Sequence, residues 1–153
     1  MLDVDVLFLS VANPMQIGIF HEDILIESIE LDGQSSEALP PAYEAIDKEY
    51  TIKGLYFVNG PGSYMAIKLT HIFLTTLHIV KNIEIYATLG FAFNNDQPIK
   101  AMGKKYFIKD RENSIILETF EKPVEQNFTL PDRLDKTIFS SDIEPLYMLP
   151  VVS

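Results

Sequence analysis

The chain contains no cysteine among its 153 residues. The missing thiols exclude a disulfide framework, a cysteine nucleophile and any metal site that depends on cysteine ligands. A composition without cysteine also fits a reducing compartment, where disulfides do not persist. Because 47% of the residues are hydrophobic and 22% are charged, the composition predicts a globular chain rather than a disordered one.

Neither the start of the chain nor its longest apolar stretch has the features of a membrane-directed segment. Asp3 and Asp5 occupy the region where a secretory leader would carry basic residues. The apolar stretch over residues 64–80 contains one lysine and two histidines, which argues against a membrane span. We therefore expect a cytoplasmic protein that does not contact a membrane.

Basic residues are scarce, with 12 lysines and arginines against 22 acidic residues and a net charge of −10. Residues 1–60 hold eleven acids and two lysines, so this part alone carries −9. Such a chain would repel RNA phosphates, and we expect it to meet tRNA only indirectly. Five bases cluster at Lys100, Lys104, Lys105, Lys109 and Arg111. We interpret them as the solvent side of a hairpin, and contact with tRNA or an acidic partner stays open.

The hydrophobic pattern predicts an α/β fold. Apolar or alternating runs predict strands at 3–11, 15–21, 24–31, 51–59 and 83–87, and helical patterns lie at 35–50 and 63–81. The order β-β-β-α-β-α-β predicts an antiparallel meander that continues through helical crossovers into parallel strands. This order is typical of the ribonuclease-H-like lobe of actin-like ATPases, which we assign to residues 1–96.

Residues 97–153 predict a reduced second lobe made mostly of short strands. Three short strands fit within 97–120, with a polar turn at 110–114, and residues 121–137 are polar and rich in turn formers. This part is too short for two crossover helices, so we expect a truncated lobe.

The first predicted helix has one clear apolar face, formed by Leu39, Tyr43 and Ile46. Ser35 or Ser36 is expected to cap it, and the prolines at 40 and 41 fit only near its first turn.

The second predicted helix is apolar on more than one face. Ala66, Leu69, Phe73, Leu77 and Val80 form a stripe suited to packing on the sheet, with Met65, Ile72 and Ile79 between the faces. The opposite side carries Ile67, Thr70, His71, Leu74 and His78. A small domain has little mass to enclose such a helix, so we expect a partner to cover this opposite side. Burial under the first helix is the alternative.

Gly60, Pro61, Gly62 and Ser63 separate a strand from the second helix. Glycines at this place can cradle phosphate or simply make a sharp turn. The Walker and dinucleotide-binding patterns are both absent, and Pro61 removes a backbone N–H that phosphate would need. We therefore predict a structural turn with Ser63 as the helix cap. His71 and His78 lie about two helical turns apart, so they cannot both bind one metal ion.

These residues resemble a known family. The segment V-N-G-P-G-S-Y-M-A-I-K-L at 58–69 is similar to the G-x-G-P-G-S-F-T-G-x-R-I segment of the bacterial TsaB (YeaZ) proteins. Weaker similarities follow the family order: S-S-E-A-L-P at 35–40 resembles H-S-x-x-L-P, and Y-A-T-L-G-F-A-F at 86–93 resembles V-S-T-L-x-x-x-A. K-A-M-G-K-K-Y-F at 100–107 resembles D-A-R-M-G-E-V-Y, and the ending from residue 144 resembles P-x-Y-L-R.

The resemblance implies an actin-like fold and a role in making threonylcarbamoyladenosine in tRNA. In this family the chain is not the catalyst. It pairs with the catalytic subunit TsaD through the two helices of its first lobe, and the ATPase TsaE joins the complex. Carried onto this sequence, the resemblance places the pairing helices at 36–49 and 63–81 and the ATP and metal on partner subunits.

Departures from the family pattern support a scaffold rather than an enzyme. The first-strand Asp-Thr of the family is Ser10-Val11 here, and D-A-R is Ile99-Lys100-Ala101. Both changes remove charged groups that could serve a nucleotide or a metal. Two alternatives remain: a nucleotide-dependent enzyme of the same fold, and a module that self-associates through the same helices. If the opposite side of the second helix binds a partner, Ile67→Asp or Leu74→Asp should weaken pairing and leave the monomer folded.

Overall fold

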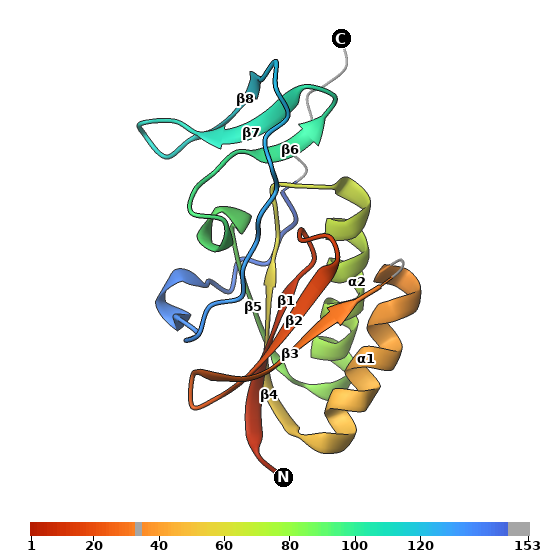
Figure 1. Ribbon diagram of the computed structural model, residues 1–153. Helices are drawn as coiled ribbons and strands as arrows, with labels where there is room; N and C mark the ends of the chain where they lie inside the picture. Colours follow the sequence, from red (N-terminus) through yellow and green to blue (C-terminus); the bar gives the residue numbers. More distant parts are fainter. Residues whose placement is uncertain (33–34, 147–153) are drawn as a thin grey trace.

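A computed structural model describes residues 1–32 and 35–146. Its elements follow the chain from the N-terminal strand to a short 3-10 helix near the C-terminus (Figure 1). In order they are β1 (Asp3–Leu9), β2 (Met15–His21), β3 (Ile24–Leu31), α1 (Ser35–Glu49), β4 (Thr51–Val58), α2 (Tyr64–Lys81), β5 (Glu84–Thr88), η1 (Gly90–Phe93), β6 (Ile99–Met102), β7 (Lys105–Lys109), β8 (Ile115–Thr119) and η2 (Lys136–Ile138).

The main sheet has five strands in the order β3-β2-β1-β4-β5. The first three strands pair antiparallel, whereas β1 pairs parallel with β4 and β4 with β5. A two-residue turn joins β2 to β3, and its residues Glu22 and Asp23 both have positive φ, as a tight hairpin requires. The helices α1 and α2 make the crossovers that parallel strands need. The mixed sheet predicted from the sequence is confirmed.

The two helices cover one face of this sheet, on the right in Figure 1. Strand alternation sends Val4, Val6 and Phe8 of β1 into a core that also receives Leu39, Tyr43 and Ile46 of α1 and Leu74 of α2. Because α1 begins at Ser35, Pro40 and Pro41 lie in its second turn rather than its first, which corrects the expectation. The expected capping by the Ser35 or Ser36 side chain falls outside the described side chains.

The returning C-terminal segment covers the other face of the sheet. Phe128, Leu134 and Phe139 pack with the inward residues Leu7, Leu9, Tyr56 and Val58 of β1 and β4. Backbone hydrogen bonds fix the segment at both sheet edges: Leu25 N donates to Asp132 O (2.9 Å), and Ala87 and Ser140 exchange two bonds of 2.9 Å. Among the residues that the structure describes, β6, β7 and β8 form the second sheet, and the apolar Phe128, Leu134 and Phe139 after them pack on the first.

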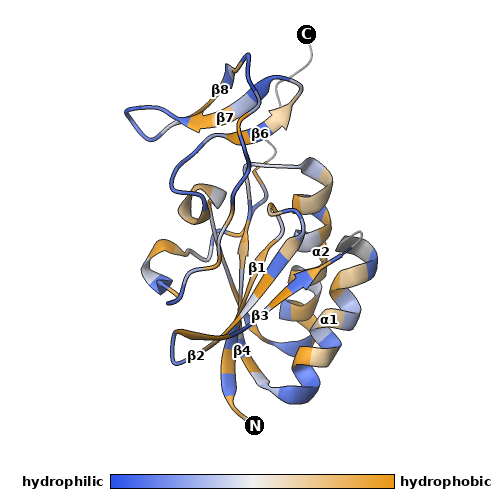
Figure 2. Cartoon of the chain, in the orientation of Figure 1, coloured by the Kyte–Doolittle hydropathy of each residue, from blue (hydrophilic) through white to orange (hydrophobic). Residues whose placement is uncertain are grey.

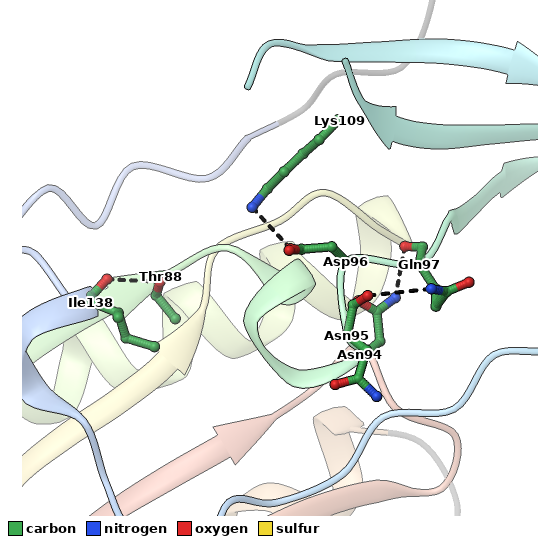
Figure 3. A network of polar contacts seen from close by, with 7 residues as sticks. All are labelled: Thr88, Asn94, Asn95, Asp96, Gln97, Lys109 and Ile138. Atoms are coloured by element: carbon green, nitrogen blue, oxygen red, sulfur yellow. Dashed lines mark hydrogen bonds and ion pairs between the residues drawn. The ribbon is translucent and has the colours of Figure 1, made fainter. Parts of the chain in front are cut away.

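The second sheet is a three-stranded antiparallel meander that is tied to the first by packing and by polar contacts. Ile99 and Phe107 enter the same core as Leu7 and Leu9. Figure 3 shows Lys109 reaching from β7 to Asp96, with an Nζ to Oδ1 distance of 3.0 Å. Of the five clustered bases, Lys104 also forms an ion pair, with Glu121 at 3.0 Å. The basic cluster is thus partly neutralised by its own chain.

Two glycines with positive φ offer a matched test of the turn before α2. Gly60 has φ +132°, and a Cβ there would lie 3.0 Å from both Cβ and the backbone oxygen of Leu146, whereas Gly103 has φ +55° and open space around it. We expect Gly103→Ala to lower the free energy of unfolding by about 1–2 kcal/mol through backbone strain alone. Gly60→Ala should lower the free energy of unfolding by more, because its new methyl group would also force Leu146 away from the turn. Urea unfolding measures both, and equal losses would contradict the close approach.

Candidate functional site

Six of the eight side chains predicted to bind a partner are buried within the chain. Leu39, Tyr43 and Ile46 of α1 and Ile67, Thr70 and Leu74 of α2 are each at most 4% exposed and face the sheet or the neighbouring helix. The choice of this side as the contact surface is therefore corrected. A charge at Ile67 or Leu74 would enter the core and disrupt folding, rather than weaken pairing alone.

The two histidines of the same set are partly exposed and engaged within the chain. His78 Nδ1 lies 2.6 Å from the carbonyl oxygen of Ile83, which follows the helix end. The ring of His71 lies 6.2 Å from the ring of Phe57 in β4. Within residues 1–32 and 35–146, no group of three or more potential ligands is arranged to hold a metal ion.

The outward side of α2 carries Met65, Ile72 and Ile79, which the sequence pattern left between the two faces. It also carries Leu69 and Val80 from the stripe predicted to pack on the sheet, and for the exposed Val80 that prediction is wrong. Met65, Ile72 and Ile79 recur every seven residues and are 57%, 51% and 73% exposed. Leu69 and Thr76 lie between them on the same side, and Val80 is 72% exposed beside Ile79. We call these six residues the outer stripe. Its spacing is that of a helix that packs along a second helix.

Thr76 belongs to the stripe without breaking its apolar character. Its Oγ1 donates to the carbonyl oxygen of Ile72 at 2.7 Å, so the hydroxyl is satisfied within the helix. In Figure 2 hydrophobic colours run along α2, whereas the C-terminal end of α1 is blue. An apolar surface at regular helical spacing is typical of a protein-binding face.

The neighbouring helix α1 presents acids beside this stripe. Asp47 lies 3.9 Å from Lys81 of α2, which identifies the side of α1 that faces its neighbour. Glu44 lies three residues before Asp47 and Glu37 seven residues before Glu44, so helical spacing places all three toward one side. Glu37 and Glu44 are exposed, and neither forms an ion pair with another described residue.

The Gly60–Ser63 segment is a turn that starts α2. The Gly60–Pro61 peptide is cis, and Gly60 O accepts from Gly90 N at 3.0 Å. Ser63 occupies the N-cap position, but its side chain makes no capping hydrogen bond, so the predicted hydroxyl cap is corrected. The helix is held there by its backbone, since Ile67 N donates to Ser63 O at 3.0 Å.

A hollow of about 420 Å³ lies between this turn and the second sheet. Its lining is mixed, formed by Val11, Asn13, Gly62, Ser63, Ile99, Lys100, Ala101 and Gln126. Ser10 directly follows the neighbouring strand β1 and is buried. The hollow therefore has one cation and no carboxylate in its lining with which to hold a metal-bound nucleotide.

An ion cluster that the sequence did not predict joins the returning segment to the main sheet. Lys136 Nζ lies 3.1 Å from Asp5 Oδ2 and 3.1 Å from Asp23 Oδ1. Burial raises the pKa of the Asp5 carboxyl, although Lys136 opposes the shift. Burial acts to lower the pKa of Lys136, but its bonds to Asp5 and Asp23 outweigh this and raise it. Burial and the nearby Asp5 raise the pKa of the Tyr56 hydroxyl to about 12. In the sequence, the feature that could have indicated this cluster is Asp5, an acidic residue within an apolar strand.

No family model matches the chain, and no curated protein matches it. YeaZ from Pseudomonas aeruginosa superposes with a TM-score of 0.58 at 10% identity, over 82% of this chain and 72% of that one. The chain has a YeaZ-like fold. A second structure, of an uncharacterized protein with similarity to peptidase YeaZ from the same organism, gives a TM-score of 0.57 at 10% identity, over 82% and 71% of the two chains. The resemblance seen in the sequence is thus confirmed at the level of the fold. No helix in the described residues is long and apolar enough to cross a membrane.

The Lys136 cluster generates a pH-dependent prediction. Lys136→Met leaves the largely buried Asp5 without its cation, so the pKa of Asp5 rises further in the folded state. A carboxyl whose pKa is higher in the folded than in the unfolded state stabilises the fold as the pH falls through that pKa. We therefore expect Lys136→Met to be less stable than the parent at neutral pH, and the deficit to shrink as the pH falls toward about 4, near the ordinary pKa of aspartate.

Thermal unfolding at several pH values measures this deficit, with Lys122→Met as the control because Lys122 is exposed and lies outside the cluster. A deficit that stays constant between neutral and acidic pH would show that Lys136 does not act through Asp5.

Proposed function

We propose that this chain is a non-catalytic partner subunit that holds another protein through the outer stripe of α2. The observation that carries the proposal is the exposure of Met65, Ile72 and Ile79, which are 51–73% accessible at seven-residue spacing. Scattered exposed apolar residues are ordinary, but a continuous helical stripe beside a charged helix supports a role in docking another helix. In this proposal the two helices still bind the partner, as the sequence predicts. The contact surface on α2 is the outer stripe and not the buried side with Ile67 and Leu74.

The YeaZ-like fold and the family motifs around Gly60–Ser63 support a specific setting for this partner. We propose the cytoplasmic machinery that makes threonylcarbamoyladenosine in tRNA, with a TsaD-like catalytic subunit as the bound protein and a TsaE-like ATPase in the larger complex. In this proposal ATP, metal and tRNA are handled by the partner subunits. The chain supports the catalytic subunit in its active arrangement as a scaffold.

The non-catalytic role is supported by the ends of the central strands. Ser10 stands at the end of β1 in place of an acid, and Leu146 packs against Gly60 at the end of β4. Asn59 Nδ2 donates to Glu144 O at 2.9 Å, and Leu146 N donates to Asn59 O at 2.8 Å. The chain's own residues therefore occupy the carboxyl end of β4, where a nucleotide of an actin-like enzyme would approach.

The test is co-purification of a tagged chain from its native cells, with the bound protein identified by mass and its affinity measured for purified variants. Ile72→Asp and Ile79→Asp should each keep the fold and lower the affinity by about 2 kcal/mol or more, as expected at the centre of an interface. Ile116→Asp is the matched control, because Ile116 is 43% exposed on β8 of the other sheet. It should leave the affinity unchanged.

Three outcomes would contradict the proposal. Unchanged affinity for both stripe variants would remove the outer stripe from the interface. Recovery of the chain alone as a dimer that Ile72→Asp dissociates would favour the self-associating module. Saturable binding of magnesium-ATP to the isolated chain would favour the nucleotide-dependent enzyme.

A further inference from the structure

The outer stripe is bordered by unequal charge along its length. Near the C-terminal ends of the helices, Asp47 and Lys81 lie 3.9 Å apart, and Lys48 and Glu49 add one charge of each sign. Farther toward the N-terminus of α1, Glu37 and Glu44 are exposed and form no ion pair with a described residue. The solvent side of α1 next to the stripe thus carries Glu37 and Glu44, with Lys48 one turn beyond Glu44.

This acidity constrains what can cover the stripe. A helix packed on Leu69, Ile72 and Thr76 would exclude water from the groove beside α1 and would partly desolvate Glu37 and Glu44. Partly buried carboxylates without cations cost free energy, and a like charge on the covering helix would add repulsion. A helix that binds the stripe favourably should therefore carry positive charge beside Glu37 and Glu44.

A second copy of the chain meets this requirement poorly. Residues 1–60, which include α1, carry −9, and the whole chain carries −10. Two copies that paired through the outward sides of the helices would bring Glu37 and Glu44 of both copies together, and the repulsion would be strongest at low salt. The charge pattern favours a different protein over self-association.

We propose that the stripe binds an amphipathic helix of another protein that carries apolar residues at heptad spacing and lysines or arginines along the edge facing Glu37 and Glu44. This inference rests on the proposed function and adds the chemistry of the bound segment. The apolar residues of that helix pack on Met65, Ile72 and Ile79, and its cations pair with the two glutamates. The stripe supplies most of the affinity, and the glutamates select the partner and orient it.

The experiment uses the full chain and two labelled synthetic helical peptides of about three heptads each. Both peptides carry leucine and isoleucine at the contact positions, and they differ only in having lysine or glutamate at the flanking positions. Fluorescence anisotropy measures their affinities, at peptide concentrations below self-association. The lysine peptide should bind about tenfold more tightly than the glutamate peptide at low salt, and the difference should narrow at high salt.

Matched variants assign the preference to the glutamates. Glu37→Lys with Glu44→Lys should reverse the preference, whereas Glu112→Lys with Glu118→Lys changes the net charge equally on the second sheet and should leave it intact. If both double variants show the same ratio of lysine-peptide to glutamate-peptide affinity, the preference reflects the net charge of the chain alone. That result would overturn the inference.

The outcomes separate the inference from the proposed function. If both peptides bind equally and Ile72→Asp abolishes both, the stripe is a docking surface and only the charge selectivity is wrong. If neither peptide binds, or if light scattering shows a dimer that the stripe variants dissociate, the inference is overturned. In those cases the co-purification experiment still decides the proposed function independently.

Discussion

The five-stranded sheet is apolar on both faces, and the rest of the structure depends on covering it. Strand alternation sends Val6 and Phe8 of β1 to one side and Leu7 and Leu9 to the other, and all four are fully buried. The helices α1 and α2 cover the first face. No further long helix follows in the described chain, so the irregular segment after β8 returns to cover the second face and is fastened there by backbone bonds and by Lys136.

This arrangement explains why α2 has two apolar surfaces. Its inner surface, with Ile67 and Leu74, is buried, whereas Met65, Ile72 and Ile79 on its outward side stay exposed and lie outside the core. The returning segment lies on the opposite face of the sheet and cannot cover them (Figure 1). An exposed stripe on a helix whose inner side is already packed is a surface that a partner can bind without the chain having to refold.

The sequence predicts the positions of the helices and strands well, but it does not predict which side of α2 is buried. The predicted strands at 15–21 and 24–31 match β2 and β3, because alternation and turn residues mark their ends. On α2 apolar residues occur on every side, and the one polar residue among them that is buried, Thr70, gives no signal of direction. The sequence therefore predicts the wrong rotation of this helix about its axis. The position of the segment after residue 120 was also out of reach, because it depends on long-range contacts such as Phe128 with the sheet and on the pairing of Lys136 with Asp5.

The most direct measurement of the central claim is methionine oxidation in the complex recovered from native cells. Met65 lies in the outer stripe and is 57% exposed, whereas Met102 lies on the second sheet and is 45% exposed. In the isolated chain both should be oxidised at comparable rates by dilute peroxide, since both thioethers are accessible. The account predicts that Met65 becomes protected in the complex while Met102 does not. Oxidation of Met65 at the rate of the free chain, with Met102 protected instead, would place the interface on the second sheet and contradict it.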